Sequence, residues 1–345
     1  MYILNSETIQ ALLPINKPVL SESCAKMFDI FMNKTLPDNI TISEPFRDCV
    51  QCVYDYYNEH GAGTILNSVN TFPLNKIDIA KNKNVIVGMS GGLDSCYLAL
   101  YLKTNGYDVT ALHVNKLNTY AASNEDKMAK EFCEHANIKY VAIDHKRNKP
   151  NVYYENPLRN QLVMGFMIDY ALENNISNIA VGSDWTEPLS DCQLGLDVTD
   201  SKEVNETFWK GVKDIITNMN LIFIEDNVKK VDRIKFIIDT NKDLFDDVYS
   251  CVMATRFVQS LKKKNEEKFG VKLLKNRCGS CVKCCREFLY LCHLGYYDND
   301  AIPNVLFKDH CWDVIGNSKF ALQLDKYGPK VPLQKRWENL LNQGS

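Results

Sequence analysis

The stretch Asn84–Ser95, NVIVGMSGGLDS, decides the fold. It begins with a short run of valine and isoleucine, which is typical of a strand buried on both faces of a parallel sheet. A glycine pair follows at once, and the residues from Asp94 onwards fit a helix. A strand, a glycine-rich turn and a helix in this order bring backbone N–H groups and a helix N-terminus to one place, where they bind an anion such as phosphate.

The turn itself, Ser90-Gly91-Gly92-Leu93-Asp94-Ser95, indicates what kind of phosphate compound binds. The two serines add hydroxyl donors, whereas the aspartate places a negative charge where phosphate is expected. That charge is repulsive unless it holds Mg²⁺ or shapes the loop, so it predicts a nucleotide accompanied by a metal ion. The turn lacks the Gly-Lys-Ser/Thr of a Walker-type loop and the third glycine of the dinucleotide-binding pattern, which excludes both of those classes.

The chain continues as an alternation of strands and helices. This alternation predicts an α/β fold with a parallel sheet covered on both faces, and a ligand site at the carboxyl ends of the strands. We expect strands at 84–89, 107–114, 139–144, 178–182 and 221–224, and helices at 94–105, 124–137, 159–174 and 208–218.

The sequence also predicts three segments. Residues 1–80 are expected to form a mostly helical extension, with helical spacing around Cys24–Met32 and Phe46–Tyr57. Residues 81–230 are expected to form the ATP-binding domain, and residues 231–345 a helical, cysteine-rich region.

The bulk composition is that of an ordinary globular protein. Hydrophobic residues make up 45% and charged residues 24% of the 345 residues, and the formal net charge is −3. These values give no overall bias towards nucleic acid or membranes, but they leave room for a local basic groove. No apolar run approaches the roughly 20 residues of a membrane span, and the first residues lack the order of a signal peptide, so we expect a cytoplasmic protein without a membrane partner.

The thirteen cysteines are an odd number and are many for a cytoplasmic protein. In a reducing compartment, a tight group of cysteines binds metal more often than it forms disulfides. Cys278, Cys281 and Cys284 follow one another at two-residue intervals, which predicts either structural zinc or an iron–sulfur cluster. The pair Cys49 and Cys52 is interpreted as coincidence on a helix face. Spacing does not fix the fourth ligand, for which the candidates are Cys251, Cys285, Cys292, His293, His310 and Cys311.

The phosphate loop resembles the SGGxDS loop of the PP-loop ATP pyrophosphatases, and together the motifs resemble the 7-cyano-7-deazaguanine synthase family. The resemblance covers residues from about 83 to 286. Beyond the loop, its matching elements are Arg159-Asn160 opening a helix, Asp191-Cys192 near the family's substrate pocket, Lys229 or Lys230 ahead of a long helix, and Ser250-Cys251 followed by Cys278, Cys281 and Cys284.

The resemblance implies a Rossmann-type PP-loop core with a small zinc-binding helical region. It also implies a C–N bond-forming enzyme that splits ATP into AMP and pyrophosphate, activating a 7-deazaguanine-type carboxylate for attack by ammonia or an amine. ATP, Mg²⁺ and Zn²⁺ are the implied cofactors. The implied site residues are Ser90, Gly91, Gly92, Leu93, Asp94 and Ser95 for pyrophosphate and Mg²⁺, His113 near the adenine, Arg159 and Lys230 for phosphate or substrate, Asn160, Asp191 and Cys192 for substrate, and Cys251, Cys278, Cys281 and Cys284 for zinc.

The chain departs from that family in three respects. The Y-G-Q-R-H segment after the second strand is absent, and Asn115-Lys116-Leu117-Asn118 stands in its place. The spacer between Cys251 and Cys278 has 26 residues, and about 80 residues precede the loop. These departures put the substrate in doubt. Three alternatives stay open: an RNA thiolation enzyme, a ligase that conjugates a small molecule to a protein partner bound by the terminal extensions, or a non-catalytic nucleotide-binding module, against which the intact loop with Asp94 argues. The family also makes a homodimer an expectation.

Overall fold

The computed structural model of the chain divides into two compact units. Unit 1 comprises residues 1–90, 98–122 and 137–226, and unit 2 comprises residues 91–97, 123–136 and 227–345. The expected boundary at residue 230 lies close to the last change of unit, whereas the expected boundary at residue 80 falls inside unit 1. The structure describes residues 4–5, 20–32, 36–61, 65–115, 122–144, 156–182, 188–192, 196–224, 228–251, 253, 255–296, 302–318, 321 and 332–342.

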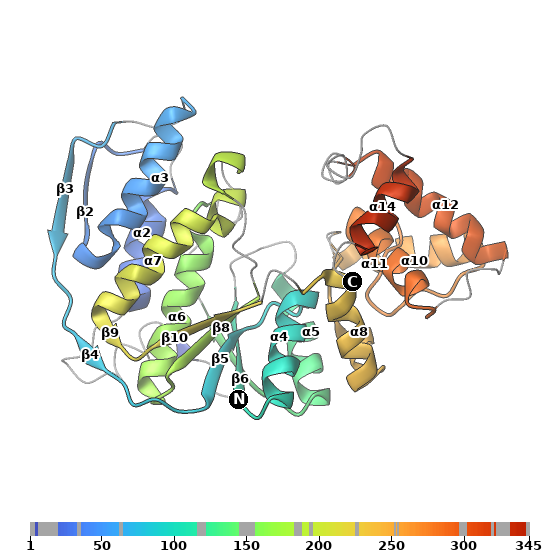
Figure 1. Cartoon of the computed structure of the whole chain (residues 1–345), viewed down its shortest axis with the longest axis horizontal. Helices are drawn as coiled ribbons and strands as arrows, with labels where there is room; N and C mark the ends of the chain where they lie inside the picture. The colour runs from blue at the N-terminus through green and yellow to red at the C-terminus, as the bar shows by residue number, and fades with distance from the viewer. Residues whose placement is uncertain are drawn as a thin grey trace. The chain divides into compact units, whose positions relative to one another are not determined.

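A parallel six-stranded sheet forms the centre of unit 1, in the order β1-β7-β6-β5-β8-β10 (Figure 1). Val85, Ile86 and Val87 of β5 are fully buried, as expected of a strand covered on both faces. The chain continues from β5 to one side of the sheet and later returns to its other side, so the carboxyl end of β5 lies at the point where strand order reverses. The strands are β1 (Leu4–Asn5), β5 (Asn84–Gly88), β6 (Asp108–Asn115), β7 (Lys139–Asp144), β8 (Asn178–Val181) and β10 (Asn220–Phe223). The parallel α/β core predicted from sequence is confirmed.

Helix α6 packs on this sheet, and α2 packs on α6. Gly165 permits the close approach of the two helices, because an added Cβ would lie 2.8 Å from the thiol of Cys24. The buried carboxylate of Asp169 on α6 accepts the N–H groups of Leu20, at 2.7 Å, and of Ser21, at 2.9 Å, at the start of α2. The helices of unit 1 are α2 (Leu20–Ile30), α3 (Arg47–Glu59), α6 (Arg159–Glu173) and α7 (Lys202–Ile215), together with most of α4 (Leu93–Thr104).

The N-terminal region also contains short strands that the sequence analysis did not predict. Strand β2 (Asn39–Ser43) pairs in parallel with β3 (Ser68–Phe72), and β4 (Ile77–Asp78) pairs with β9 (Ile216–Thr217). Pairing with β4 also explains why α7 ends before residue 216 rather than at 218. One hydrophobic core joins this region to the sheet, since α2 and α3 bury their apolar faces among the residues of α6 and α7.

Unit 2 is helical. Its core is aromatic: the rings of Phe288 and Phe307 lie 4.6 Å apart, and those of Phe269 and Phe307 lie 5.3 Å apart. Its helices are α8 (Lys230–Thr240), α9 (Leu244–Asp247), α10 (Thr255–Phe269), α11 (Val282–His293), α12 (Ile302–Gly316) and α14 (Leu333–Asn342), with nearly all of α5 (Ala122–His135) and the first turn of α4.

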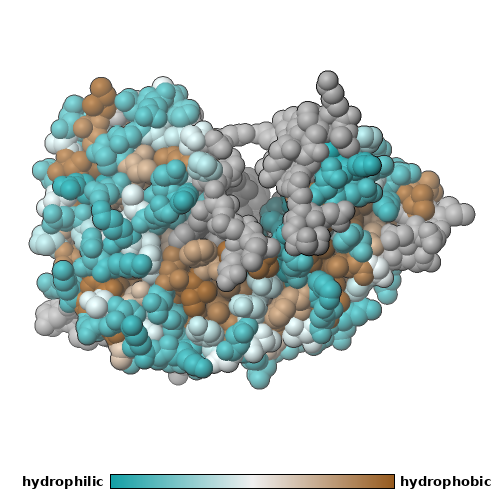
Figure 2. Space-filling model, in the orientation of Figure 1, coloured by the Kyte–Doolittle hydropathy of each residue, from teal (hydrophilic) through white to brown (hydrophobic). Residues whose placement is uncertain are grey.

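The surface of the molecule is mainly polar. Figure 2 shows hydrophilic side chains over much of the visible face, with hydrophobic areas between them. No helix within the described residues combines the length and the apolar character that crossing a membrane requires. Among those residues, the large hydrophobic side chains that are more than 40% exposed are Ile65, Tyr101, Phe223, Phe257, Val305 and Leu306.

Candidate functional site

The glycine-rich loop follows β5 and opens α4, as the sequence predicted. Gly91 has a φ of +76°, a left-handed conformation that glycine adopts without strain. A Cβ at this position would also lie 3.0 Å from the backbone nitrogen of Ala129 on α5. The carbonyl oxygen of Gly91 accepts the N–H of Tyr249 at 2.7 Å, and the hydroxyl of Ser95 donates to the carbonyl of Gly92 at 3.1 Å. The loop is therefore held in one shape by contacts within unit 2.

The Asp94 carboxylate is the charged centre of the loop. The guanidinium Nη1 of Arg233 donates to its Oδ1 at 2.6 Å, and Nζ of Lys230 lies 3.5 Å from its Oδ2. The Arg233 side chain is only 4% exposed, and it is fixed further by Nε and Nη2, which donate to the carbonyl of Val228 at 3.2 and 2.9 Å. Two cations thus lie beside the residue that was predicted to take part in binding Mg²⁺ and pyrophosphate.

These cations set the ionisation of the loop carboxylate. Burial raises the pKa of Asp94, but the positive charges of Lys230 and Arg233 together outweigh burial and hold the pKa below its ordinary value. Asp94 is therefore an anion at neutral pH. An ionised carboxylate is the form that binds a divalent cation, and the two side-chain cations offset negative charge near the loop.

The structure distinguishes the two lysines that the sequence left open. The ammonium group of Lys229 donates to the carbonyl of Leu341 at 3.0 Å, at the end of α14. The ammonium group of Lys230 points instead to Asp94. Arg233 is the site residue that sequence reasoning missed, although it follows Lys230 by three residues on α8 and so lies on the same face of that helix.

His113 occupies the carboxyl end of β6, in unit 1. Its Nδ1 lies 2.7 Å from the carbonyl oxygen of Met89, and the side chain is buried. Because a carbonyl can only accept, Nδ1 is the donor in this contact. The N–H of Met89 donates in turn to the carbonyl of Leu112 at 2.8 Å. His113 therefore joins the end of β6 to the residue just before the phosphate loop, and its role near adenine stays a prediction.

Arg159 and Asn160 begin α6 in unit 1, as predicted. The amide of Asn160 donates to Oδ1 of Asp200 at 2.6 Å, and its backbone N–H donates to the hydroxyl of Thr199 at 2.9 Å. Both partners belong to the short 3-10 helix η4 (Leu196–Asp200). Asn160 therefore ties the start of α6 to the segment ahead of α7. Contact of Arg159 or Asn160 with substrate stays a prediction.

Cys192 follows the 3-10 helix η3 (Leu189–Asp191) in unit 1. Its thiol is buried and donates to the carbonyl of Pro188 at 3.5 Å, and its own carbonyl accepts the hydroxyl of Tyr56. These contacts fit a packed thiol, and the contact of Cys192 with substrate that the resemblance implied stays a prediction. The side chain of Asp191, predicted to read the base of a substrate, lies outside the described part of the chain.

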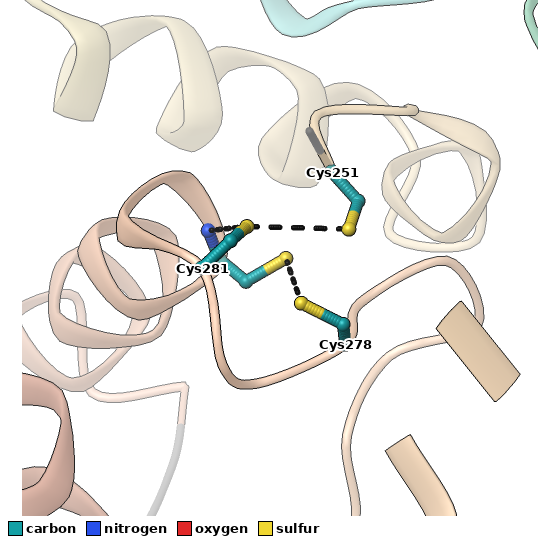
Figure 3. Close-up of side chains that lie close together, drawn as sticks. Cys251, Cys278 and Cys281 are labelled. Atoms are coloured by element: carbon teal, nitrogen blue, oxygen red, sulfur yellow. Dashed lines mark hydrogen bonds between the residues drawn. The ribbon is translucent and has the colours of Figure 1, made fainter. Parts of the chain in front are cut away.

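Four cysteine thiols converge in unit 2. The Sγ atoms of Cys251, Cys278, Cys281 and Cys284 all lie within 4.8 Å of one another. Figure 3 shows three of these thiols directed towards one another from two separate loops. The separation is 4.0 Å between Cys251 and Cys281 and 3.8 Å between Cys278 and Cys284. The structure therefore selects Cys251 as the fourth member of the group, as the resemblance implied.

The geometry and charge of this group fit a single metal ion. Zn–S bonds of about 2.3 Å in a tetrahedron separate the sulfur atoms by about 3.8 Å. Two of the observed distances are 3.8 and 4.0 Å, and all lie within 4.8 Å. An iron–sulfur cluster needs more room, because each thiolate binds a different iron. Hydrogen bonds within the group, that of Cys251 first, lower the pKa of Cys281, and they raise the pKa of Cys251 and Cys284. The convergence of the four sulfur atoms is therefore the observation that fits a metal.

A buried arginine lies next to the four thiols. Arg277 precedes Cys278, is 4% exposed, and donates to the carboxylate of Glu287 and to the carbonyl of Val248. Burial lowers the pKa of Arg277, but the neighbouring negative charges, that of Glu287 first, raise it above its ordinary value overall. The guanidinium therefore stays charged, and it offsets the negative charge that four thiolates and one divalent ion would leave.

The other cysteine and histidine candidates are not part of this group. The thiol of Cys285 donates to the carbonyl of Gly279 at 3.8 Å, and Nε2 of His310 lies 3.0 Å from the same carbonyl. Cys49 donates to the carbonyl of Val204 at 3.6 Å, and burial raises its pKa. Within the described residues, no second group of at least three His, Cys, Asp or Glu side chains is arranged to hold a metal.

Comparison with known proteins agrees with the fold of the sheet region. Residues 83–171, about a quarter of the chain, match the family model described as the tRNA methyl transferase HUP domain. The chain is 28% identical over 135 residues to 7-cyano-7-deazaguanine synthase of Sulfolobus acidocaldarius, which covers 32% of this chain and 29% of that protein. It is 40% identical over 73 residues to the tRNA-specific 2-thiouridylase MnmA of Karelsulcia muelleri, covering 21% of this chain and 19% of that protein.

A solved structure matches over more of the chain but at low similarity. The U34-tRNA thiolase NcsA from Methanococcus maripaludis with its [4Fe-4S] cluster shares 18% identity over 77% of this chain and 74% of that chain, with a TM-score of 0.28. A score this low does not establish a shared fold. The chain spans less than a third of the length of the two curated relatives named above. The segment that contains the phosphate loop and the first strands of the sheet is therefore similar to the HUP domain of these proteins.

Proposed function

We propose that this chain is an adenylating enzyme that splits ATP into AMP and pyrophosphate to activate a carboxylate. The observation that carries the proposal is Asp94, an ionised carboxylate in the phosphate loop that is held by Arg233 and Lys230. The loop opens a helix where the strand order reverses, the usual place for a ligand in a parallel sheet. The relatives include a 7-cyano-7-deazaguanine synthase and a tRNA-specific 2-thiouridylase.

Each loop residue has a role in this proposal. The backbone N–H groups around Gly91 and Gly92 and the hydroxyls of Ser90 and Ser95 bind the pyrophosphate portion of ATP. Asp94 holds Mg²⁺, which neutralises phosphate charge when bound. Arg233 and Lys230 then stabilise the charge that grows on the leaving pyrophosphate.

The proposed substrate is a 7-deazaguanine-type carboxylate, and the proposed acceptor is ammonia or an amine. Thiolation is the rival reaction, and it needs a reactive thiolate or an iron–sulfur cluster. Twelve of the cysteines are buried and Cys52 is partly buried. Burial raises the pKa of Cys52 to about 11, which leaves it mostly protonated at neutral pH. This cysteine chemistry favours carbon–nitrogen bond formation over sulfur transfer.

Zinc is the metal we propose for the four-cysteine group. Four thiolates leave no open coordination position, so its role is structural. Elemental analysis of the purified chain should give one zinc per chain and no visible absorption band. Iron with acid-labile sulfide would instead support the thiolation alternative. We also propose that the chain forms a homodimer. The segments outside the sheet are proposed to bind a protein partner.

A turnover assay tests the proposed reaction. Purified chain is incubated with Mg²⁺-ATP, ammonium and 7-carboxy-7-deazaguanine, and nucleotides and products are resolved by mass. We expect AMP together with an amide or a nitrile, and loss of AMP formation by at least a hundredfold in Asp94→Asn. Asp239→Asn on α8 is the matched control, since Asp239 pairs only with the exposed Lys235 in the described ion pairs. The absence of AMP with every carboxylate tested would refute the adenylation proposal.

A further inference from the structure

The formal charge is divided unequally along the chain. Residues 227–345 contain 21 lysines and arginines against 14 acidic residues, whereas residues 1–226 contain 19 against 29. A chain that is weakly acidic overall therefore carries most of its excess positive charge in its C-terminal third. An excess of lysine and arginine is one feature of regions that bind a polyanion, provided that these residues gather on one face.

Much of this charge lies on α10, which belongs to the long spacer between Cys251 and Cys278. The inner face of α10 is fixed to the four-cysteine group. Val258 is 3% exposed and packs in the same hydrophobic cluster as the four cysteines. The amide of Asn265 donates at 2.8 Å to the carbonyl of Cys278 and at 2.8 Å to the hydroxyl of Ser280. The helix is thus a firmly held element rather than a loose insertion.

The outer face of α10 carries an exposed aromatic ring and exposed lysines. Phe257 is 44% exposed, and Lys264 and Lys268 are exposed. These three residues follow one another at seven- and four-residue intervals, so they lie along one side of the helix over about 16 Å. On the same helix Lys263 pairs with Glu267 at 3.8 Å, whereas none of the ion pairs among the described residues involves Lys264 or Lys268. Nζ of Lys268 lies 4.6 Å from the ring centroid of Phe269.

An exposed ring in line with lysines has a specific chemistry. Ammonium groups bind phosphates without reading sequence, and an aromatic ring stacks on an unpaired base. A folded duplex keeps its bases inside the stack, so a ring on a helix surface serves a single strand. An acidic polypeptide would use the lysines but would gain nothing comparable from Phe257.

We propose that the outer face of α10, formed by Phe257, Lys264 and Lys268, binds a single-stranded nucleic acid. The inference goes beyond the proposed adenylation, because it involves neither ATP nor the loop. It places a polynucleotide on the region of the chain that lies outside the matched HUP domain.

Fluorescence anisotropy with labelled 20-nucleotide strands of RNA and DNA tests the proposal on the full chain, without ATP. We expect binding that weakens with salt. Lys264→Gln combined with Lys268→Gln should reduce the slope of log K against log salt by about 1.4, since each phosphate contact contributes about 0.7. Phe257→Ala should weaken binding roughly ten- to hundredfold, as expected for the loss of one stacked base.

The control is Lys81→Gln combined with Lys83→Gln, which removes the same charge from exposed lysines of unit 1 and should leave the affinity within twofold. Circular dichroism checks that each variant is folded. Binding of either strand, or of both, supports the surface, and the difference between RNA and DNA identifies the sugar. The proposal is overturned by any of three results: no binding at low salt, a slope unchanged in the lysine variant, or polyglutamate bound as tightly as the strands. An unchanged affinity in Phe257→Ala overturns the assignment to a single strand.

Discussion

Replacing Arg233 by methionine tests whether the loop carboxylate depends on its buried cation. Methionine has a similar length and is a good helix former, so α8 itself should persist. The change removes the hydrogen bond to Asp94 and the two hydrogen bonds to the carbonyl of Val228. It leaves Asp94 with Lys230 alone, at 3.5 Å.

The expected size of the effect follows from burial. Breaking a buried ion pair by removing one partner costs roughly 3–5 kcal/mol. The Asp94 side chain is 31% exposed, so water replaces part of the lost interaction. We therefore expect unit 2 to lose about 2–4 kcal/mol of unfolding free energy. For a unit of its size this lowers the melting temperature by roughly 6–12 °C.

The assay is thermal unfolding over a range of pH, combined with AMP formation at saturating ATP. Because the pKa of Asp94 is lowered in the folded protein, its contribution to stability is complete above the ordinary carboxyl pKa and is lost as the pH falls through the folded value. The difference in melting temperature between wild type and variant should therefore be largest at neutral pH and shrink below about pH 4. AMP formation should fall at least tenfold.

Lys235→Met is the matched control on the same helix. Lys235 is 58% exposed and forms only a surface pair with Asp239, which is worth little. Its melting temperature should stay within about 2 °C of wild type. If Arg233→Met melts like this control at neutral pH and keeps full AMP formation, then Arg233 neither holds Asp94 nor supports the chemistry, and the reasoning fails.

Three further changes test other parts of the structure. Burial raises the pKa of Asp169 to about 7, so between about pH 4 and pH 7 the folded state keeps a proton that the unfolded chain has lost. The free energy of unfolding should therefore fall by up to about 4 kcal/mol as the pH rises through this range. In urea titrations Asp169→Asn should flatten this dependence of the unfolding free energy on pH. Gly91→Ala should raise the Kd for ATP at least tenfold, because its Cβ meets the backbone of Ala129, whereas Gly106→Ala, with similar φ but open space, should lose only about 1–2 kcal/mol of stability. Cys251→Ser should lose bound metal and weaken ATP binding while the sheet of unit 1 keeps its melting transition, and an unchanged Kd in metal-free protein would contradict this coupling.

The sheet was predictable because its signals are local. Each long strand of the sheet is a short apolar run, and polar or glycine-containing segments separate the strands from the helices between them, so no tertiary information was needed. Strands β2 and β3 were missed although Asn39–Ser43, NITIS, alternates at period two. Proline-rich surroundings made the region look broken, and the pairing of β2 with β3, across α3, is not visible in either segment alone. Helix α7 begins at Lys202, whereas the sequence analysis expected it to begin at residue 208. The start was missed because its polar first turn shows no apolar period.

The candidate site also has residues that local sequence signals predicted and residues that they did not. The loop from Ser90 to Ser95 and three of the four cysteines are contiguous motifs, so sequence alone found them. Cys251 lies 27 positions before Cys278 and was selected only through a resemblance, which the clustering of the four thiols then supported. Arg233 was missed because a lone arginine in a helix carries no motif. Its i+3 spacing from Lys230 was nevertheless a usable signal, since both side chains lie on one face.

The two motifs that sequence found separately are physically connected within unit 2. Tyr249 donates its N–H to the carbonyl of Gly91, and Cys251 follows only two residues later. On the other side of the loop, Met128 packs with the four cysteines, and the next residue, Ala129, is the one that a side chain at Gly91 would strike. A metal ion that fixes Cys251 therefore restrains the segment that binds the loop carbonyl, and the cluster that includes Met128 restrains the backbone beside Gly91. We expect loss of a bound ion to free both supports together, so the metal group would act on nucleotide binding through the shape of the loop rather than through contact with the nucleotide.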